Sequence, residues 1–202
     1  NTIDPGKMIE AYGADAVRFF ILSDSPPEKD IQWSDSGMAS AFRYVQKFWL
    51  LNEKILKIIK QKTAESNEKI DFFVNQAISK INYALESFRY NVIISVFHEF
   101  YSFFNKVSEN ELHFSNLKEN YKKILIVMMP VIPHIINECL ESLNEKDEIS
   151  WPKVNEKFIQ SDMCNIVVQI NGKKRSVISV ERNLKEKIII EKIQNDKSLD
   201  KF

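Results

Sequence analysis

Apolar residues recur every three or four positions along four long stretches of the chain, the spacing that places them on one face of an α-helix. The first, third and fourth predicted helices span about 35–60, 91–107 and 117–143, and the second contains the apolar positions from Ile70 to Phe88. Pro130 and Pro133 should bend the last helix or break it in two, because proline removes a backbone donor and clashes with the preceding turn. Modest loops between amphipathic helices favour an antiparallel helical bundle. The predicted apolar seams are Ala41, Tyr44, Phe48, Leu51, Ile55 and Ile58; Ile70, Val74, Ala77, Ile81, Ala84 and Phe88; Ile93, Val96, Phe100, Phe103 and Val107; and Tyr121, Ile124, Met128, Ile132, Ile135 and Leu140.

Two shorter helices are predicted before the bundle. Asp4 and Pro5 form a helix start, with an N-cap acceptor followed by proline in the first turn. Gly13 is placed to end that helix in the left-handed conformation. The segment ADAVRFFILS then predicts a second short helix that is apolar on most faces and therefore largely buried.

A stiff, acidic segment, SDSPPEKDIQWSDSG, separates the second short helix from the bundle. Pro26 and Pro27 stop the helix before them, because each lacks an N–H group and restricts the residue that precedes it. Trp33 can anchor the segment on apolar neighbours, and Ser34 can cap the first bundle helix. We interpret the segment as a rigid joint whose acidic residues face solvent or a neighbouring domain.

The pattern changes after Trp151 and Pro152. The stretches CNIVVQI and RSVISV are rich in β-branched residues, and Asn171-Gly172 between them is a strong hairpin signal. The stretch LKEKIIIEKI then returns to helical spacing. Two strands and a helix do not close a sheet, so the C-terminal part is expected to be truncated. The predicted fold is mainly α, with a short connector, an antiparallel helical bundle and a small α+β C-terminal domain.

Composition narrows the class of protein only in part. The chain has 202 residues, of which 44% are hydrophobic, so it is long and apolar enough to fold, and its 28 basic and 28 acidic residues balance. Acidic residues prevail near the start and basic residues near the end, a mild bias that is compatible with a nucleic-acid contact. The two cysteines are far apart, and we expect a reducing, cytoplasmic compartment. No apolar run is long enough for a membrane span.

No catalytic or metal-binding constellation is visible in the sequence. The histidines, His98, His113 and His134, lack metal-ligand spacing, and no glycine-rich phosphate loop occurs. We interpret His134 as a capping or packing residue beside the proline bend, and Asp15 as a carboxylate that caps or solvates its helix. We therefore expect no catalytic residue, bound cofactor or metal within this chain.

The predicted hairpin tip is the first candidate for RNA contact. Asn171, Gly172, Lys173, Lys174 and Arg175 form the tip, where the cations could meet phosphates. The alternative is a solvated turn with charged edge residues, which are common on exposed hairpins.

Arg43 and Arg89 are further candidates, because each is followed by a tyrosine, Tyr44 and Tyr90. By themselves the two arginines cannot be distinguished from ordinary surface charges beside core aromatic residues. We expect no exposed aromatic stacking platform in the bundle.

The order of several short motifs carries a resemblance to a known family. The chain contains DP, a helix, YGAD-x-x-R, PPEKD-x-x-WS, RYN at the start of a bundle helix, P-x-x-P-H, WP and VQINGKKR. In this order the motifs resemble leucyl-tRNA synthetases of bacterial type, a family of class I aminoacyl-tRNA synthetases. The resemblance covers essentially the whole chain. Its most specific parts are PPEKD-x-x-WS and VQINGK, because the valyl, isoleucyl and methionyl relatives depart there.

The resemblance implies a C-terminal fragment that begins just after the KMSKS loop. This ATP-binding loop would lie immediately before Asn1, and the other catalytic motifs and the editing domain would lie further upstream. The full-length enzyme would use ATP and Mg²⁺ to attach leucine to tRNA(Leu), whereas the fragment alone would be inactive.

The resemblance also implies a division into domains and a partner. The implied domains are a connector over 1–33, a helical anticodon-binding type domain over 34–150 and the start of a tRNA-binding domain over 151–202. The implied partner is tRNA(Leu), not DNA or a membrane, and a monomer is expected.

The family match further favours RNA contact at the hairpin, through shape and backbone recognition. The chain departs from the family at Asn137 and Leu140, where an acidic residue and a tryptophan are usual, and this weakens any functional role for His134. Two alternatives stay open. One is the corresponding fragment of a valyl, isoleucyl or methionyl enzyme, and the other is a stand-alone helical interaction module.

Overall fold

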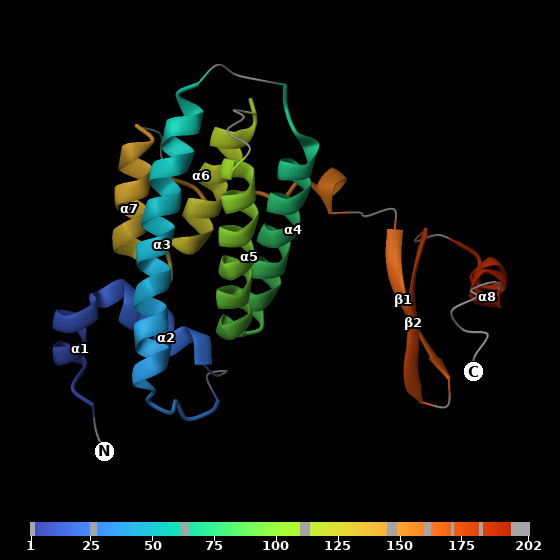
Figure 1. Ribbon diagram of the computed structural model, residues 1–202, viewed down its shortest axis with the longest axis horizontal. Helices are drawn as coiled ribbons and strands as arrows, with labels where there is room; N and C mark the ends of the chain where they lie inside the picture. Colours follow the sequence, from blue (N-terminus) through green and yellow to red (C-terminus); the bar gives the residue numbers. More distant parts are fainter. Residues whose placement is uncertain are drawn as a thin grey trace. The chain divides into compact units, whose positions relative to one another are not determined.

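The computed structural model describes residues 3–24, 28–61, 65–109, 114–144, 149–159, 163–170, 172–181 and 184–194. The chain divides into two compact units, 1–155 and 156–202 (Figure 1). The elements are α1 (Pro5–Tyr12), α2 (Ala14–Asp24), α3 (Asp35–Ile59), α4 (Glu68–Glu86), α5 (Tyr90–Glu109), α6 (Leu117–Met128), α7 (Pro133–Ser142), a 3₁₀ turn (Glu156–Phe158), β1 (Met163–Ile170), β2 (Lys173–Glu181) and α8 (Glu186–Gln194).

Several predictions fall on residues that are not described. Asn1, Pro26, Pro27, His113 and Asn171 lie outside the described residues. The expected place of Asn1, directly after an ATP-binding loop, therefore stays a prediction. The same holds for the proline stop and for the asparagine of the hairpin tip.

The first unit is the predicted helical bundle. Helix α5 packs against α3 and α4, and α6 packs against α4 and α7 (Figure 1). Helices α1 and α2 cover one end, where α2 lies against α3 and α5. The predicted fourth helix is broken in two: α6 ends at Met128 and α7 begins at Pro133. Proline in the first turn of α7 needs no backbone donor, and this explains why the new helix begins there.

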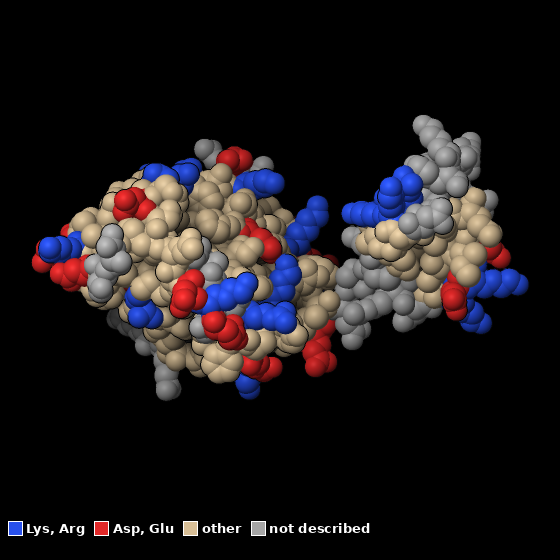
Figure 2. Space-filling view, turned by 90° about the horizontal axis from the view of Figure 1, so that it is seen from below, with Lys and Arg blue, Asp and Glu red and all other residues tan. Residues whose placement is uncertain are grey.

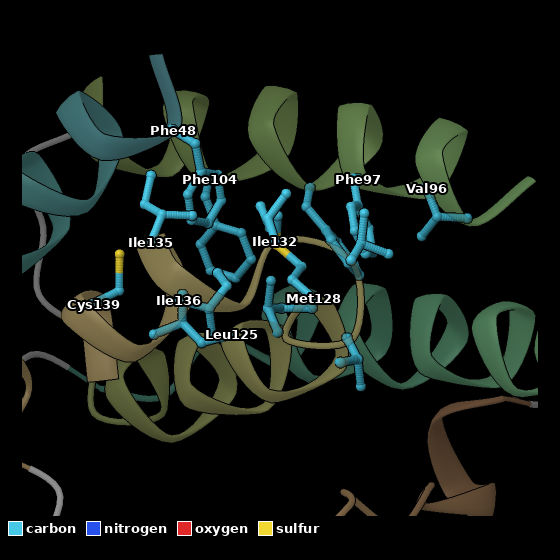
Figure 3. Close-up of a cluster of buried hydrophobic side chains, with 14 of the residues drawn as sticks. Phe48, Val96, Phe97, Phe104, Leu125, Met128, Ile132, Ile135, Ile136 and Cys139 are labelled. Atoms are coloured by element: carbon cyan, nitrogen blue, oxygen red, sulfur yellow. The ribbon is translucent and has the colours of Figure 1, made fainter. Parts of the chain in front are cut away.

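A single core joins the bundle helices. Phe48 from α3, Phe97 and Phe104 from α5, and Leu125 and Met128 from α6 are all buried within it (Figure 3). Burying a large apolar side chain contributes roughly 1.5–3 kcal/mol, so this core is the main source of stability in the unit. The predicted α3 seam is buried at every position, from Ala41 to Ile58.

The predicted α4 seam is wrong at its last position. Helix α4 ends at Glu86, and Phe88 is 60% exposed, with a positive φ of 55°. The N–H of Arg89 donates to the carbonyl of Ala84 (2.8 Å) and the N–H of Phe88 to that of Leu85 (3.2 Å). This pair of bonds is the Schellman helix end, which places its left-handed residue at Phe88. The helix end therefore turns Phe88 away from the seam.

The α5 seam is also shifted at one position. Phe104 is buried in place of the predicted Phe103, which is only partly buried and stacks on Phe73 at 3.9 Å between ring centroids.

A polar clamp fixes α2 to the turn between α6 and α7. The buried carboxylate of Asp15 accepts hydrogen bonds from the backbone N–H groups of His134 (3.3 Å) and Ile135 (2.8 Å), and lies 2.8 Å from His134 Nδ1. Arg18 donates from Nε to the carbonyl of Val131 (2.9 Å) and from Nη2 to that of Pro130 (2.6 Å). Asp15 thus caps α7, whose own N-cap residue makes no side-chain cap bond.

The predicted cap and anchor before α3 are confirmed. The Ser34 hydroxyl accepts from the N–H of Gly37 (3.2 Å), and the Trp33 indole donates to Asp35 (2.7 Å). Trp33 packs on the core, with its ring edge-on to that of Phe20 at 5.2 Å between centroids. A Cβ atom on Gly37 would lie 2.8 Å from the Phe20 ring, so glycine permits this close approach.

The predicted start of α1 is confirmed, and its end differs in detail. Asp4 accepts from the N–H of Gly6 at 2.9 Å. Gly13 ends the helix with φ 81° and ψ 153°, which is a positive-φ extended conformation rather than the left-handed helical one. Such a conformation is open almost only to glycine.

The segment that follows the bundle still belongs to the first unit. Trp151 Nε1 donates to Asn82 of α4 (2.9 Å), and the N–H of Asn155 donates to Asn75 of the same helix (2.7 Å). The elements of the second unit are the 3₁₀ turn, the β1–β2 ribbon and α8. Within the described part of the chain, no helix combines the length and apolarity that a membrane crossing requires.

Candidate nucleic-acid interface

The hairpin in the second unit presents the first group of predicted RNA-binding residues. Strands β1 and β2 pair antiparallel, from Met163 opposite Glu181 to Ile170 opposite Lys173. This register leaves a two-residue loop, and Gly172 within it has a φ of 74°. Two-residue hairpin loops favour positive φ because it matches the twist of the strands. The predicted hairpin is confirmed, with its tip where the sequence places it.

A β-bulge divides the basic residues between the two faces of the ribbon. Gln169 pairs with Lys174, whereas the preceding Val168 pairs with Ser176, so Arg175 is the extra residue of β2. Lys173 and Lys174 belong to opposite faces, because neighbouring strand residues alternate. The tip therefore offers cations in more than one direction.

All the described residues of the tip are exposed. Gly172, Lys173, Lys174 and Arg175 lie at the surface, and below them Val168 and Val180 are buried. A tip of this kind can make electrostatic contacts with phosphates, and it carries no group suited to covalent or acid–base chemistry.

Arg43 is an exposed residue of α3, and its aromatic neighbour belongs to the core. The Nη2 atom of Arg43 donates to the hydroxyl of Ser40 at 2.8 Å. Tyr44 is buried and donates its hydroxyl hydrogen to the carbonyl of Phe97 (2.8 Å), and burial holds the pKa of Tyr44 well above its ordinary value. Tyr44 is therefore unavailable for stacking on a base.

Arg89 occupies the Schellman turn between α4 and α5. It is exposed, while the ring of Tyr90 is partly buried against the core. The hydrogen bond between Tyr44 and Phe97 places Arg43, the residue before Tyr44, near the level of Phe97. Phe97 follows Arg89 by eight residues, which corresponds to about 12 Å along α5 at 1.5 Å per residue. The two arginines are not brought together.

Two aromatic side chains are exposed near the end of α4. Tyr83 is 63% exposed and Phe88 is 60% exposed, and the ring of Phe88 lies edge-on to that of Tyr90. The sequence could not show this, because Phe88 continues the apolar spacing of α4 and only the helix end removes it from the seam.

The remaining titratable groups have structural surroundings. Burial raises the pKa of the Cys139 thiol to about 12, with a smaller contribution from the Glu138 carboxylate. Cys139 lies within the core (Figure 3) and is unreactive in this protonation state. Among the described residues, no three His, Cys, Asp or Glu side chains are grouped as metal ligands. Figure 2 shows Lys and Arg interspersed with Asp and Glu over the face of the helical unit in that view.

Comparison with known proteins gives the class of protein. Residues 67–190 match the family described as the anticodon-binding domain of tRNA ligase. The chain therefore belongs to the anticodon-binding domain family of tRNA ligases.

The curated relatives of the chain are leucine–tRNA ligases. The relative from Bartonella quintana is 34% identical over 207 residues, which cover 96% of this chain and 23% of that protein. The relative from Fusobacterium nucleatum is 31% identical over 208 residues, which cover 95% of this chain and 24% of that protein. The chain thus spans about a quarter of the length of these relatives. They confirm the resemblance to leucyl-tRNA synthetases over the valyl, isoleucyl and methionyl enzymes and over a stand-alone module.

A solved structure shows the same fold. The LeuRS of Agrobacterium radiobacter K84, determined in a ternary complex with tRNA and LeuAMS, aligns with a TM-score of 0.77 at 23% identity. The alignment covers 96% of this chain and 26% of that one. The predicted mainly α bundle with a small hairpin unit is confirmed.

Proposed function

We propose that this chain is the tRNA-binding, C-terminal portion of a leucine–tRNA ligase, and that the whole enzyme attaches leucine to tRNA(Leu). The observation that carries the proposal is that leucine–tRNA ligases align with 91–96% of the chain. The similarity therefore includes the segment before the bundle, the bundle and the hairpin unit.

The chemistry of the whole enzyme would reside outside this chain. ATP and Mg²⁺ would supply the activation of leucine, with the ATP-binding loop immediately before Asn1, and a separate editing domain would hydrolyse mischarged tRNA. The described residues offer no fitting site for ATP or Mg²⁺, since they form no glycine-rich phosphate loop and no group of metal ligands. We therefore derive no catalytic step in this chain and expect it to be inactive alone.

The role of the chain would be to hold tRNA in position. In this proposal residues 1–33 connect the catalytic body to the bundle, residues 34–150 lie along the tRNA, and residues 151–202 begin a second tRNA-binding domain. The clamp between Asp15 and the start of α7 supports the connector role, because it fixes α2 rigidly on the bundle. Positioning matters for the rate of the reaction, because even a small displacement of a reacting group can lower that rate by a large factor.

The hairpin tip would contact the sugar–phosphate backbone of the tRNA. Lys173, Lys174 and Arg175 are exposed and cationic, and double-helical RNA offers phosphates and ribose hydroxyls more readily than base edges. Asn171, which completes the tip in the sequence, stays a prediction.

The test is a binding titration of the purified chain. Fluorescence anisotropy with labelled tRNA(Leu) should show weak binding at low salt that falls steeply as salt rises, whereas duplex DNA of equal length should bind less tightly. Undetectable binding at low salt, or equal affinity for the DNA, would overturn the tRNA role. Sedimentation velocity should show a monomer, and leucine-dependent ATP–pyrophosphate exchange should be absent.

A further inference from the structure

A stripe of basic residues, interrupted by one leucine, runs along the exposed side of α3. Its members follow a spacing of four, three, four and three, so they share one face of the helix. Between the first and last members, Glu53 is the one acidic residue of the helix. All members are exposed, and they are Arg43, Lys47, Leu50, Lys54 and Lys57.

The stripe borders a groove between α3 and α5, which lie side by side (Figure 1). A hollow of about 290 Å³ lies between the two helices, and its lining consists of Lys47, Leu50, Leu51, Glu53, Lys54 and Lys57 from α3 and of Tyr101 and Asn105 from α5. A second hollow of about 390 Å³ follows it and shares two lining residues with the first, Lys54 and Lys57. We call the two hollows together the α3–α5 groove.

The cations of the α3–α5 groove are available to a ligand. Lys47 and Lys57 form no ion pair with any of the residues that the structure describes, and Lys54 Nζ makes a long contact (3.5 Å) with Asn105 Oδ1. Two acidic residues also line the groove, Glu53 of α3 and Glu109 of α5, and Glu109 accepts a hydrogen bond from Asn105 Nδ2 at 2.9 Å. The wall of the groove on α3 carries three lysines, Lys47, Lys54 and Lys57, against one glutamate, Glu53, and its net charge is therefore positive.

The length and chemistry of the groove fit an RNA backbone. The ten steps from Lys47 to Lys57, the first and last lysines that line the groove, correspond to about 15 Å along the helix axis at 1.5 Å per residue. That length is enough for several consecutive phosphates of one RNA strand. Tyr101 and Asn105 add neutral hydrogen-bonding groups on the facing helix, which suit ribose hydroxyls and phosphate oxygens.

We propose that the α3–α5 groove binds the sugar–phosphate backbone of an RNA helix. The proposal rests on the proposed tRNA-binding function and adds to it a surface in the helical unit, apart from the hairpin tip. Each lysine contributes a phosphate contact, so the groove supplies about three of the counterions that are released on binding.

The test compares two triple charge reversals in the whole chain. The groove variant is Lys47→Glu, Lys54→Glu, Lys57→Glu. The matched control is Lys7→Glu, Lys69→Glu, Lys153→Glu, which changes the net charge equally at exposed positions outside the groove. Circular dichroism melts establish that both variants fold, and anisotropy titrations with labelled tRNA(Leu) at several salt concentrations measure affinity and salt dependence.

The groove variant should bind tRNA at least about tenfold more weakly than the control at low salt, and its log–log salt slope should be smaller by about 2–3. Replacement of the same three lysines by arginine should keep the affinity within about threefold, because the charge is retained. Equal binding by the groove and control variants, while the parent chain still binds tRNA, overturns the groove proposal alone. Absence of binding by the parent chain overturns the proposed function and the groove proposal with it. Stronger retention of an acidic peptide than of tRNA by the parent chain also contradicts an RNA groove.

Discussion

The helical unit and the hairpin unit use their residues in contrasting ways. In the bundle, the helices share one apolar core, and even charged residues such as Asp15 and Arg18 are used to join elements. In the hairpin unit, Val167 and Val177 are 48% and 45% exposed, and the basic tip lies at the surface. In this account the stability of the chain depends on core and joining residues, whereas the proposed RNA contacts involve exposed residues. Substitutions should therefore change one property without the other.

The largest effect on folding is expected from the clamp. Asp15→Ala should lower the free energy of unfolding by about 3 kcal/mol, because it removes the cap of α7 and leaves the buried N–H of Ile135 without its acceptor. Urea unfolding followed by circular dichroism measures the change. The matched control Glu10→Ala, at an exposed position of α1, should stay within about 0.5 kcal/mol.

The clamp has a second, intermediate variant. Asp15→Asn keeps one acceptor oxygen and should lose about half as much stability as Asp15→Ala. If all three variants unfold at the same urea concentration, α2 is not fixed by this clamp, and the contrast between the units is weakened.

The converse effect is expected at the hairpin tip. Lys173→Glu with Arg175→Glu should weaken tRNA binding about tenfold while the melting temperature stays unchanged, because the tip is exposed and its contacts are with phosphates. The control pair Lys185→Glu with Lys187→Glu makes an equal charge change in the same unit. An equal loss of affinity in the two pairs of substitutions would show that net charge causes the effect, and it would contradict a specific role for the tip.

A smaller effect of opposite sign is expected at the end of α4. Phe88→Gly should raise the free energy of unfolding by about 1 kcal/mol, since glycine adopts the positive φ of this position without the steric cost. Tyr83→Gly, at an exposed position inside the same helix, should instead lower it by about 1 kcal/mol. Thermal unfolding distinguishes them, and a shift in the same direction for both would contradict the assigned helix end.

The smallest effect concerns pH. The ring of His98 lies edge-on to Tyr44 at 4.8 Å and to Phe19 at 5.8 Å, and partial burial lowers the pKa of His98 from its ordinary value of 6.5. A lowered pKa means that the folded state favours the neutral ring. Stability should therefore fall as pH drops below 6.5 towards the folded pKa. In urea titrations, the His98→Gln variant should lose less stability than the parent chain across this pH range. An unchanged dependence of stability on pH would show that His98 is not its cause.

The spacing of apolar residues predicted the bundle because burial on one helix face is a local, periodic property. The seam from Ala41 to Ile58 needed only this rule. The misplaced Phe88 shows its limit, because a helix end depends on hydrogen bonds that periodicity does not encode. The interpretation of Asp15 as a residue that caps or solvates its own helix is wrong, because its buried carboxylate accepts from the N–H of Ile135 in α7, 120 residues away, and such pairs follow only from the packed fold.

The candidate site was predicted less completely. The Asn171-Gly172 signal located the hairpin, and Lys173 to Arg175 are at its tip as expected, but the bulge that divides them between faces had no signal in the sequence. The α3–α5 groove was missed for another reason. Lys47, Lys54 and Lys57 occupy the polar face of an amphipathic helix, where lysine is ordinary, and only the neighbouring α5 makes a groove beside them.

Hydrogen exchange of the chain with and without saturating tRNA(Leu) tests the division between the two units most directly. Bound tRNA should slow exchange of the backbone amides at residues 172–176 by a larger factor than that of the core amides of α6, which can slow only through stabilisation of the helical unit by binding at the groove. Duplex DNA at the same concentration should give little protection at the tip. Saturated binding of tRNA without protection of residues 172–176 would contradict the assignment of RNA contact to the hairpin.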